Sequence, residues 1–380
     1  TLASTQEDPA ERTRNWSTGS WIRLADTDHH NFGAALEWSF TEGDDEAAIG
    51  LVAALWRYWW WARPLVGCDW LERALSGPVG TVTPERLEAL IGLGVLLPRS
   101  GRAPIQEGEE RLREVVRLGL EAGVDGEVAR ARYFLGELAL SRGEPVEAEP
   151  LLRAALESFE AMDAPFSAAW CHHALGWMAM ARGERRLAQD HFEYILDLTR
   201  RHVAAELLRV HAVAGLAPLA ALAGNPELAE ALADDGVTVA RRLPAPGFLV
   251  MALTRAGETA LLSGRRPTAV LRELLNLLVD LGARAWVDEV LEMVALVCEE
   301  DAAPAAARLL GAAGARSDRR GRVLSNEVNG CYDRLAKTLG PDAFAEHEAA
   351  GRSLSAGEAL SFALTELQTH AVARTEPRNE

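Results

Sequence analysis

Tryptophan is the residue whose clustering in this sequence most strongly indicates a binding chemistry. One cluster comprises Trp56 together with Trp59 and Trp60 of the segment RYWWWA that follows it, and a second contains Trp170 and Trp177. Indole rings offer a large, flat apolar area, lose little rotamer entropy on binding and carry one N–H donor. Such rings suit an organic ligand or a partner helix, although aromatic residues in helical hairpins also form the packing between helices.

Histidine pairs in the sequence do not form a metal site. His29 and His30 are adjacent, as are His172 and His173. On a helix, neighbouring side chains point about 100° apart, so neither pair can easily hold one ion. Because HExxH is also missing from the sequence, we expect no metal.

Motifs for catalysis are likewise missing. The sequence contains no GxSxG elbow, no GxxxxGK[ST] phosphate loop and no GxGxxG after a strand. Cys171 precedes His172, but neighbouring side chains on a helix diverge, and Cys171 is better explained as a small buried residue. We therefore expect a protein that is not an enzyme and that holds no cofactor.

Charge and composition indicate which partners and which cellular location to expect. The net charge is 39 − 56 = −17 over 380 residues, and an acidic chain repels phosphate backbones, so direct nucleic-acid contact is not expected. No apolar run reaches the roughly 18 residues of a membrane span, and the polar N-terminus resembles no signal peptide. Four well-separated cysteines favour reduced thiols and a cytoplasmic location. The start at Thr1 instead of methionine suggests a piece of a larger protein.

A repeat of about 40 residues organises the chain. Glycines at 143, 183, 224 and 264 are 40, 41 and 40 residues apart, and alanines follow five residues later, at 148, 188, 229 and 269. Two independent series of small residues with one period indicate a repeat architecture.

Each repeat unit has the pattern of a helical hairpin. In the unit 127–162, apolar residues recur at helical spacing up to Gly143, where a left-handed turn costs glycine little. Pro145 can then begin the second helix, and Gly136 and Ala148 would let the two helices approach closely. Because no alternating β-branched run occurs, we predict an all-α fold of six or seven hairpins with atypical end units. The expected segments are a flexible linker 1–15, leading helices 16–45, the repeat array 46–316, a loop 317–325, a C-terminal helical cap 326–366 and a disordered tail 367–380.

The pattern of glycine, alanine and leucine resembles the tetratricopeptide repeat, with a period somewhat longer than the usual ~34 residues. Longer segments resemble the C-terminal helical region of actinobacterial STAND-type regulators, the large ATP-binding LuxR family. The resembling segments are DHHNFGAALEWSFTEGD (Asp28–Asp44), ALWRYWWWARPLVGCDWLERAL (Ala54–Leu75), APAAARLLGAAGARSD (Ala303–Asp318) and AEHEAAGRSLSAGEALSFAL (Ala345–Leu364).

This resemblance implies a right-handed superhelix in which the first helix of each hairpin lines the concave side. Taking Gly136 and Gly176 as the eighth residue of their units sets the register of the inner positions. Glu137 and Glu258 could then pair with a ligand amine or hydroxyl, although solvated side chains are the alternative. The inner positions predicted to contact a ligand or partner are Trp56, Trp59, Trp60, Arg130, Tyr133, Glu137, Trp170, His173, Trp177, Met180, His211, Met251, Thr254 and Glu258.

The resemblance also implies a regulatory role. In such regulators the helical array senses an effector or partner protein and controls a nucleotide-binding switch domain, which this chain lacks. We therefore expect a small-molecule effector or a partner peptide in the groove and contact with a switch domain. The alternative is a tetratricopeptide scaffold that binds a peptide or protein and no small molecule.

Overall fold

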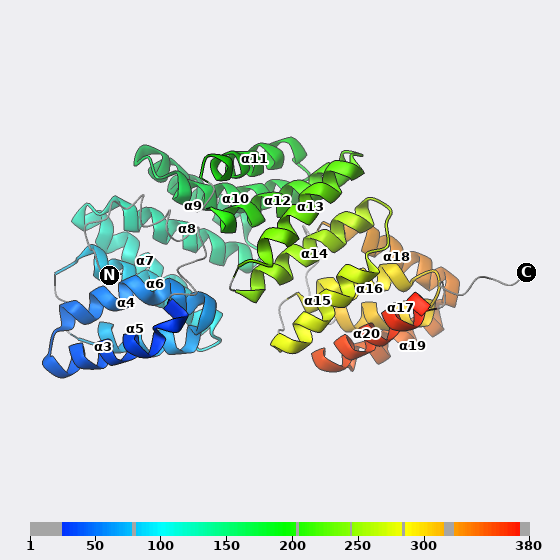
Figure 1. The fold of residues 1–380 in the computed structure, drawn as a ribbon, viewed down its shortest axis with the longest axis horizontal. Coiled ribbons are helices and arrows are strands. Elements are labelled where there is room, and N and C mark those ends of the chain that lie inside the picture. Colours follow the sequence, from blue (N-terminus) through cyan, green and yellow to red (C-terminus); the bar gives the residue numbers. More distant parts are fainter. Residues whose placement is uncertain are drawn as a thin grey trace, which may run out of the picture. The chain divides into compact units, whose positions relative to one another are not determined.

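The computed structural model describes residues 25–77, 81–202, 205–243, 245–282, 286–314 and 323–372, with side chains to residue 369. Throughout these ranges the regular secondary structure is α-helical and contains no strand, so the predicted all-α fold is confirmed. Figure 1 labels the helices α3 to α20. The predicted linker 1–15, residues 317–322 of the predicted loop and residues 373–380 of the predicted tail lie outside the described residues.

Contacts divide the chain into two compact units. Among the described residues, unit 1 comprises those within 25–176, 194–208 and 243–245, and unit 2 comprises those within 177–193, 209–242 and 246–372. The complete helices of unit 1 are α3 (His29–Glu42), α4 (Asp45–Ala62), α5 (Pro64–Leu75), α6 (Pro84–Arg99), α7 (Ile105–Ala122), α8 (Asp125–Ser141) and α9 (Pro145–Ala161). Helices α10 (Pro165–Ala181), α11 (Arg185–Arg201) and α12 (Glu206–Leu222) contribute residues to both units.

Unit 2 contains the remaining helices. They are α13 (Pro226–Ala240), α14 (Pro246–Leu262), α15 (Thr268–Leu281), α16 (Val287–Cys298), α17 (Ala303–Gly314), α18 (Ser325–Leu339), α19 (Pro341–Arg352) and α20 (Ala356–Val372). Helix α17 packs on α16 and α19, while α20 returns along the chain to pack on α15 and α16. The C-terminal helices therefore cover the last hairpins from more than one side.

Local sequence explains where the helices of a hairpin begin and end. Gly143 follows α8 in the left-handed region, with φ of +77°, and Pro145 occupies the first turn of α9. The equivalent glycines 183, 224 and 264 have φ values of +74°, +77° and +70°. The glycine series read from the sequence therefore marks one recurring turn.

Close packing inside a hairpin depends on glycine at the helix crossing. A Cβ atom at Gly136 would lie 2.7 Å from Leu152 Cγ and 3.4 Å from the Ala148 carbonyl oxygen. In the preceding hairpin, a Cβ atom at Gly108 would lie 2.3 Å from the Gly94 carbonyl oxygen. These separations leave no room for a side chain, so the close approach predicted for the hairpin of Gly136 and Ala148 is confirmed, and the preceding hairpin shows the same close packing.

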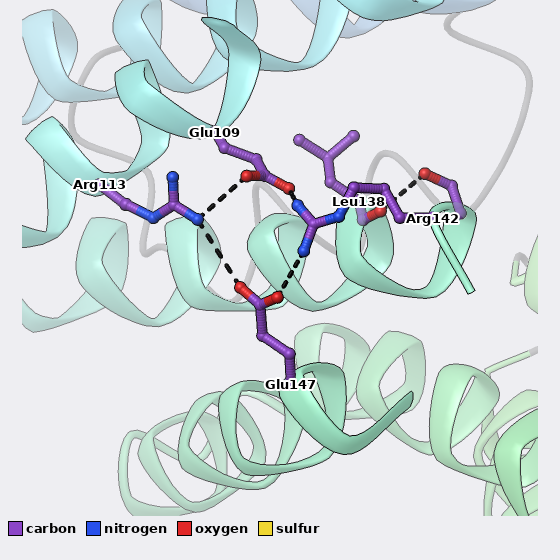
Figure 2. A network of polar contacts seen from close by, with 6 residues as sticks. Glu109, Arg113, Leu138, Arg142 and Glu147 are labelled. Carbon is purple, nitrogen blue, oxygen red and sulfur yellow. Dashed lines mark hydrogen bonds and ion pairs between the residues drawn. The ribbon is translucent and has the colours of Figure 1, made fainter. Parts of the chain in front are cut away.

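Ion pairs join consecutive hairpins in unit 1. Figure 2 shows Arg113 and Arg142 placed between the carboxylates of Glu109 and Glu147. Arg113 lies 3.0 Å from Glu109 and 3.6 Å from Glu147, and Arg142 at the end of α8 pairs with both. Glu109 is buried. The network therefore links α7 of one hairpin to α8 and α9 of the next.

Three further features complete the description of the fold: the end of helix α20, the state of the cysteines and the absence of a helix that could cross a membrane in the described ranges. Helix α20 extends to Val372, and Leu367 is buried, so the helix runs into the segment 367–380 for which we expected a disordered tail. Its apolar face continues past residue 366, which explains the difference. All four cysteines are free and buried. No helix in the described ranges has both the length and the apolar character needed to cross a bilayer.

Candidate functional site

The first helices of the hairpins in unit 1 bring five aromatic residues together. This aromatic cluster consists of Trp56, Trp60 and Trp61 on α4 and Tyr133 and Phe134 on α8. The ring centroids of Trp56 and Trp60 lie 6.2 Å apart, and both lie within 6 Å of the Phe134 ring. Trp60 and Trp61 are only half-buried. Their exposed edges can therefore contact a ligand, while the other rings hold them in place.

A charged cluster of Arg57, Glu88 and Arg130 lies beside these rings. The Glu88 carboxylate on α6 pairs with both guanidinium groups and accepts a 2.8 Å hydrogen bond from Trp56 Nε1. The Arg57 guanidinium lies 4.4 Å from the Trp56 ring centroid. Helices α4, α6 and α8 therefore meet through their side chains on one face, which we call the first-helix face.

Electrostatics within this charged cluster favour ionised Glu88. Burial alone would raise the pKa of its carboxyl, but Arg130, Arg57 and the Trp56 N–H outweigh burial and lower the pKa to about 2. Burial lowers the pKa of Arg57 to about 9, against the opposing effect of Glu88. The cluster is therefore a charged, internally paired element at neutral pH.

Glu137, one of the predicted site residues, has a different environment. It is half-buried on α8, and its carboxyl forms no hydrogen bond or ion pair with a described residue. Burial raises the pKa of this carboxyl to about 7. Burial and the nearby Glu137 charge also raise the pKa of Tyr133 well above its usual value. The first-helix face thus contains a carboxyl without an internal partner.

Trp170 and His173 lie on α10, the first helix of the next hairpin, at positions that the sequence register predicts to face inward. Both are half-buried, and their rings meet edge to face at a centroid distance of 6.1 Å. The neighbouring His172 instead stacks on Tyr194 at 3.9 Å. The structure therefore separates the two adjacent histidines, as the helix geometry predicted.

In unit 2, the predicted residues Trp177 and Glu258 are joined by Arg255. The Arg255 guanidinium lies 4.6 Å from the Trp177 ring centroid and 5.1 Å from that of Trp286. It pairs with Glu258 at 2.6 Å and with Glu289 at 3.9 Å. Trp286 has a φ of +71°, which is rare for a non-glycine residue. This stacked arrangement is a second cluster, formed by residues of unit 2.

Several predicted contacts are core residues, which corrects the sequence-based assignment. Trp56 and Trp59 are 0% and 3% exposed, because they pack against Gly92 and Gly67, where a Cβ atom would lie within 2.7 Å of each tryptophan Cβ. The predicted residues that are also buried are Tyr133, His211, Thr254 and Glu258. The Thr254 hydroxyl donates to the Val250 carbonyl at 2.8 Å. These side chains stabilise the fold; those that remain half-buried are Trp60, Arg130, Glu137, Trp170, His173, Trp177, Met180 and Met251.

Some residues of these clusters were not predicted. With Gly94 as the eighth residue of the second hairpin, Glu88 falls at the inner second position, equivalent to Arg130, so the same register would have found it. Arg57 and Arg255 lie next to inner positions, and Trp286 belongs to one of the atypical end units, where the repeat register is lost. No sequence signal therefore marks these three residues. In the described part of the chain, no group of histidine, cysteine and carboxylate side chains is arranged to hold a metal ion.

Comparisons with known proteins identify the fold. No protein-family model and no curated protein matches this sequence. The apo form of the quorum sensor NprR from B. thuringiensis is similar over 94% of this chain and 97% of its own, with 12% identity and a TM-score of 0.53. NprR in complex with its cognate peptide NprX gives 12% identity, coverage of 87% and 99%, and a TM-score of 0.49.

A third solved structure is BtubC (BKLC) from P. vanneervenii, at 18% identity and a TM-score of 0.42 over 61% of this chain and 91% of its own. At such low identities structural similarity establishes the fold alone, and among these three structures apo NprR carries that conclusion. Together with the recurring hairpins, it shows that the chain has a tetratricopeptide-like helical repeat fold.

Proposed function

We propose that this chain is a recognition domain that binds an effector, a small organic molecule or a peptide, on the first-helix face of unit 1. The observation that carries the proposal is the combination of half-buried aromatic rings with an unpaired carboxyl. Trp60, Trp61 and Trp170 offer partly exposed apolar surface, and Glu137 offers a polar group that no described residue satisfies. Ligand sites typically combine apolar walls with a few such polar groups.

A regulatory role for this recognition is the finer part of the proposal. Effector binding would favour one conformation of the array and so bias a nucleotide-binding switch domain outside this chain. Support comes from the segments that resemble STAND-type regulators, among them Asp28–Asp44 and Ala54–Leu75. NprR, whose apo form has a similar fold, is a quorum sensor, so the fold is compatible with sensing.

The alternative is a scaffold that binds a peptide or protein without any small-molecule effector. The half-buried aromatic rings support this alternative as well, because apolar side chains of a partner helix or peptide can pack on them. The alternative shares the same surface and differs in the chemical nature of the ligand.

Binding selections with Trp170→Ala test the proposal. A phage-displayed random peptide library and a thermal-shift screen of small organic compounds are applied to the wild-type chain. Binders from either selection should lose at least tenfold in affinity for Trp170→Ala, measured by calorimetry, while circular dichroism stays unchanged. Compounds alone would identify the ligand as a small molecule, and peptides alone would identify it as a peptide, which is the ligand expected of the scaffold alternative.

Trp38→Ala is the matched control, because Trp38 is 62% exposed on α3. Its removal takes away the same indole group from outside the first-helix face. Binders that depend on Trp38 and ignore Trp170 would refute the proposed surface, as would the absence of binders in both selections.

A further inference from the structure

Glu137 differs from the other carboxylates near the aromatic residues in having no internal partner. Glu88 pairs with Arg57 and Arg130, and Glu258 pairs with Arg255. Glu137 makes neither an ion pair nor a hydrogen bond within the described part of the chain, although it is half-buried. Removing a carboxylate from water without supplying a partner is unfavourable, so this position needs an explanation.

Within the described part of the chain, no arginine, lysine or histidine forms an ion pair with Glu137. Tyr133 lies one helical turn earlier on α8, and Cys171 on α10 interacts electrostatically with Glu137. Both are neutral at physiological pH because burial, with Glu137 as a further cause, raises the pKa of each group. The negative charge of Glu160 on α9 also raises the pKa of Cys171. Tyr133 and Cys171 are therefore neutral and Glu160 is acidic, while the imidazole of His173 on α10 packs against Trp170.

On the other helices that pack on α8, several of the described charged groups already have partners within the chain. Glu88 of α6 is held between Arg57 and Arg130, and the α7 residues Glu109 and Arg113 belong to the network shown in Figure 2. Burial is the one cause of the shift in the pKa of Glu137, with no arginine contributing. The guanidinium groups of Arg57, Arg130 and Arg113 are thus committed to other carboxylates, while Arg99 of α6 donates to the Trp60 carbonyl oxygen at 3.0 Å.

The Tyr133 hydroxyl is the second polar group without a hydrogen bond to a described residue. A phenol hydroxyl can donate to an acceptor and accept from a donor. Tyr133 also packs edge to face on Phe134, at 4.9 Å, and so belongs to the aromatic cluster. An unpaired carboxyl and an unpaired hydroxyl therefore lie beside apolar rings.

We propose that Glu137 is the acceptor for a positively charged nitrogen group of the bound effector, an ammonium or guanidinium attached to an apolar body. This inference rests on the proposed function of the first-helix face. A cation gives the carboxylate a charge-assisted hydrogen bond that no neutral donor matches. The exposed edges of Trp60 and Trp61 contact the apolar body. The cation comes either from a free organic amine or from an arginine, lysine or terminal amine of a peptide.

The protonation of Glu137 gives this recognition a pH dependence. With its pKa raised to about 7, the carboxyl is substantially protonated near neutral pH. A guanidinium stays charged because its own pKa exceeds 12. Affinity for a guanidinium probe is therefore greatest above pH 8 and falls as the pH decreases through 7, since protonation removes the charge that attracts the probe.

The test uses two probes of this chemistry. Phenethylguanidine represents a free amine-type effector, and an acetylated, amidated Leu-Arg-Leu tripeptide represents a peptide. A Leu-citrulline-Leu tripeptide replaces the arginine with a neutral group of the same shape. Calorimetry or tryptophan fluorescence at pH 8 gives the affinity of each probe for the wild-type chain and for Glu137→Gln, and the stronger of the two charged probes identifies the source of the cation.

Glu137→Gln should reduce the affinity for the preferred charged probe at least tenfold and abolish its dependence on pH between 6 and 8. Glu157→Gln, which removes an exposed carboxylate of α9, should leave both unchanged. A citrulline tripeptide that binds as tightly as the arginine tripeptide would overturn the inference, as would equal binding of the charged probes to wild type and Glu137→Gln. Selected binders that need Trp170 but carry no cation would refute the role of Glu137 while leaving the proposed function intact.

Discussion

Glu137 should give the stability of this protein a pH dependence opposite in sign to that of Glu88. The pKa of Glu137 is raised from 4.5 to about 7 in the folded chain, so the unfolded chain releases this proton first. Its contribution to stability is therefore lost as the pH rises from 4.5 to 7. The pKa of Glu88 is lowered to about 2, so its contribution is present above pH 4.5 and is lost as the pH falls toward 2.

Glu137→Gln should consequently stabilise the protein above pH 7 and have little effect near pH 4.5. A half-buried carboxylate kept at a cost in stability is typical of a binding residue. Denaturant unfolding of wild type and Glu137→Gln at pH 4.5, 6 and 8 measures the difference. A difference that stays constant across these values would show that the Glu137 carboxyl titrates normally, and Glu157→Gln controls for the loss of one negative charge.

In unit 2, a substitution at Arg255 can separate the contribution of its positive charge to stability from that of its flat guanidinium group. Its planar guanidinium lies against Trp177 and Trp286 and also pairs with Glu258. Arg255→Lys keeps the charge but loses the flat surface that stacks on both indoles, so we expect a loss of about 1–2 kcal/mol in unfolding free energy. Chemical unfolding followed by tryptophan fluorescence measures it. Arg265→Lys, at an exposed pair with Glu230, should change stability by less than about 0.5 kcal/mol.

At the scale of helices, the network of Figure 2 should couple neighbouring hairpins. Glu109 is buried and contacts both Arg113 and Arg142, whereas the Arg113 side chain is 52% exposed. Glu109→Ala leaves Arg142 with one carboxylate and should lower the unfolding free energy by about 2–3 kcal/mol. Arg113→Ala should cost less than about 1 kcal/mol. Equal effects of the two substitutions on thermal unfolding would contradict this ranking.

The helical hairpins could be predicted because their signals are local. The left-handed turn at Gly143 and the helix start at Pro145 each depend on a few neighbouring residues. The candidate site depends instead on side chains that meet across helices, such as Glu88 with Arg57 and Arg130, which are 31 and 42 residues away in sequence. Neighbouring residues in sequence do not specify such pairings.

Contacts between residues far apart in sequence also explain why Trp56 and Trp59 were predicted to contact a ligand but are buried. Trp56, Trp59 and Trp60 stand on one helix, and the sequence gives each the same chemistry. Gly92 and Gly67 provide the space that buries Trp56 and Trp59, while Trp60 keeps an exposed edge. Which ring becomes core thus depends on glycines of other helices.

At the scale of the whole molecule, a repeat fold predicts that a destabilising substitution increases the flexibility of nearby helices only. In repeat proteins each helix contacts mainly its near neighbours, so a strained crossing should loosen the surrounding helices and leave distant hairpins intact. The crossing of α17 and α19 provides the test, because a Cβ atom at Gly311 would lie 2.1 Å from the Glu348 carbonyl oxygen. Overpacking of this kind typically costs about 1–3 kcal/mol.

Hydrogen exchange followed by mass spectrometry should therefore show faster exchange in α16 to α20 of Gly311→Ala and unchanged exchange in α4 to α7. Gly357→Ala is the matched control, because Gly357 lies exposed on α20 with nothing within 4 Å of its added Cβ atom. Alanine there should leave exchange unchanged or slower, since alanine favours helix over glycine. Faster exchange throughout both units of Gly311→Ala would mean that the chain unfolds as one cooperative body. In that case, an effector bound on the first-helix face would influence every hairpin equally.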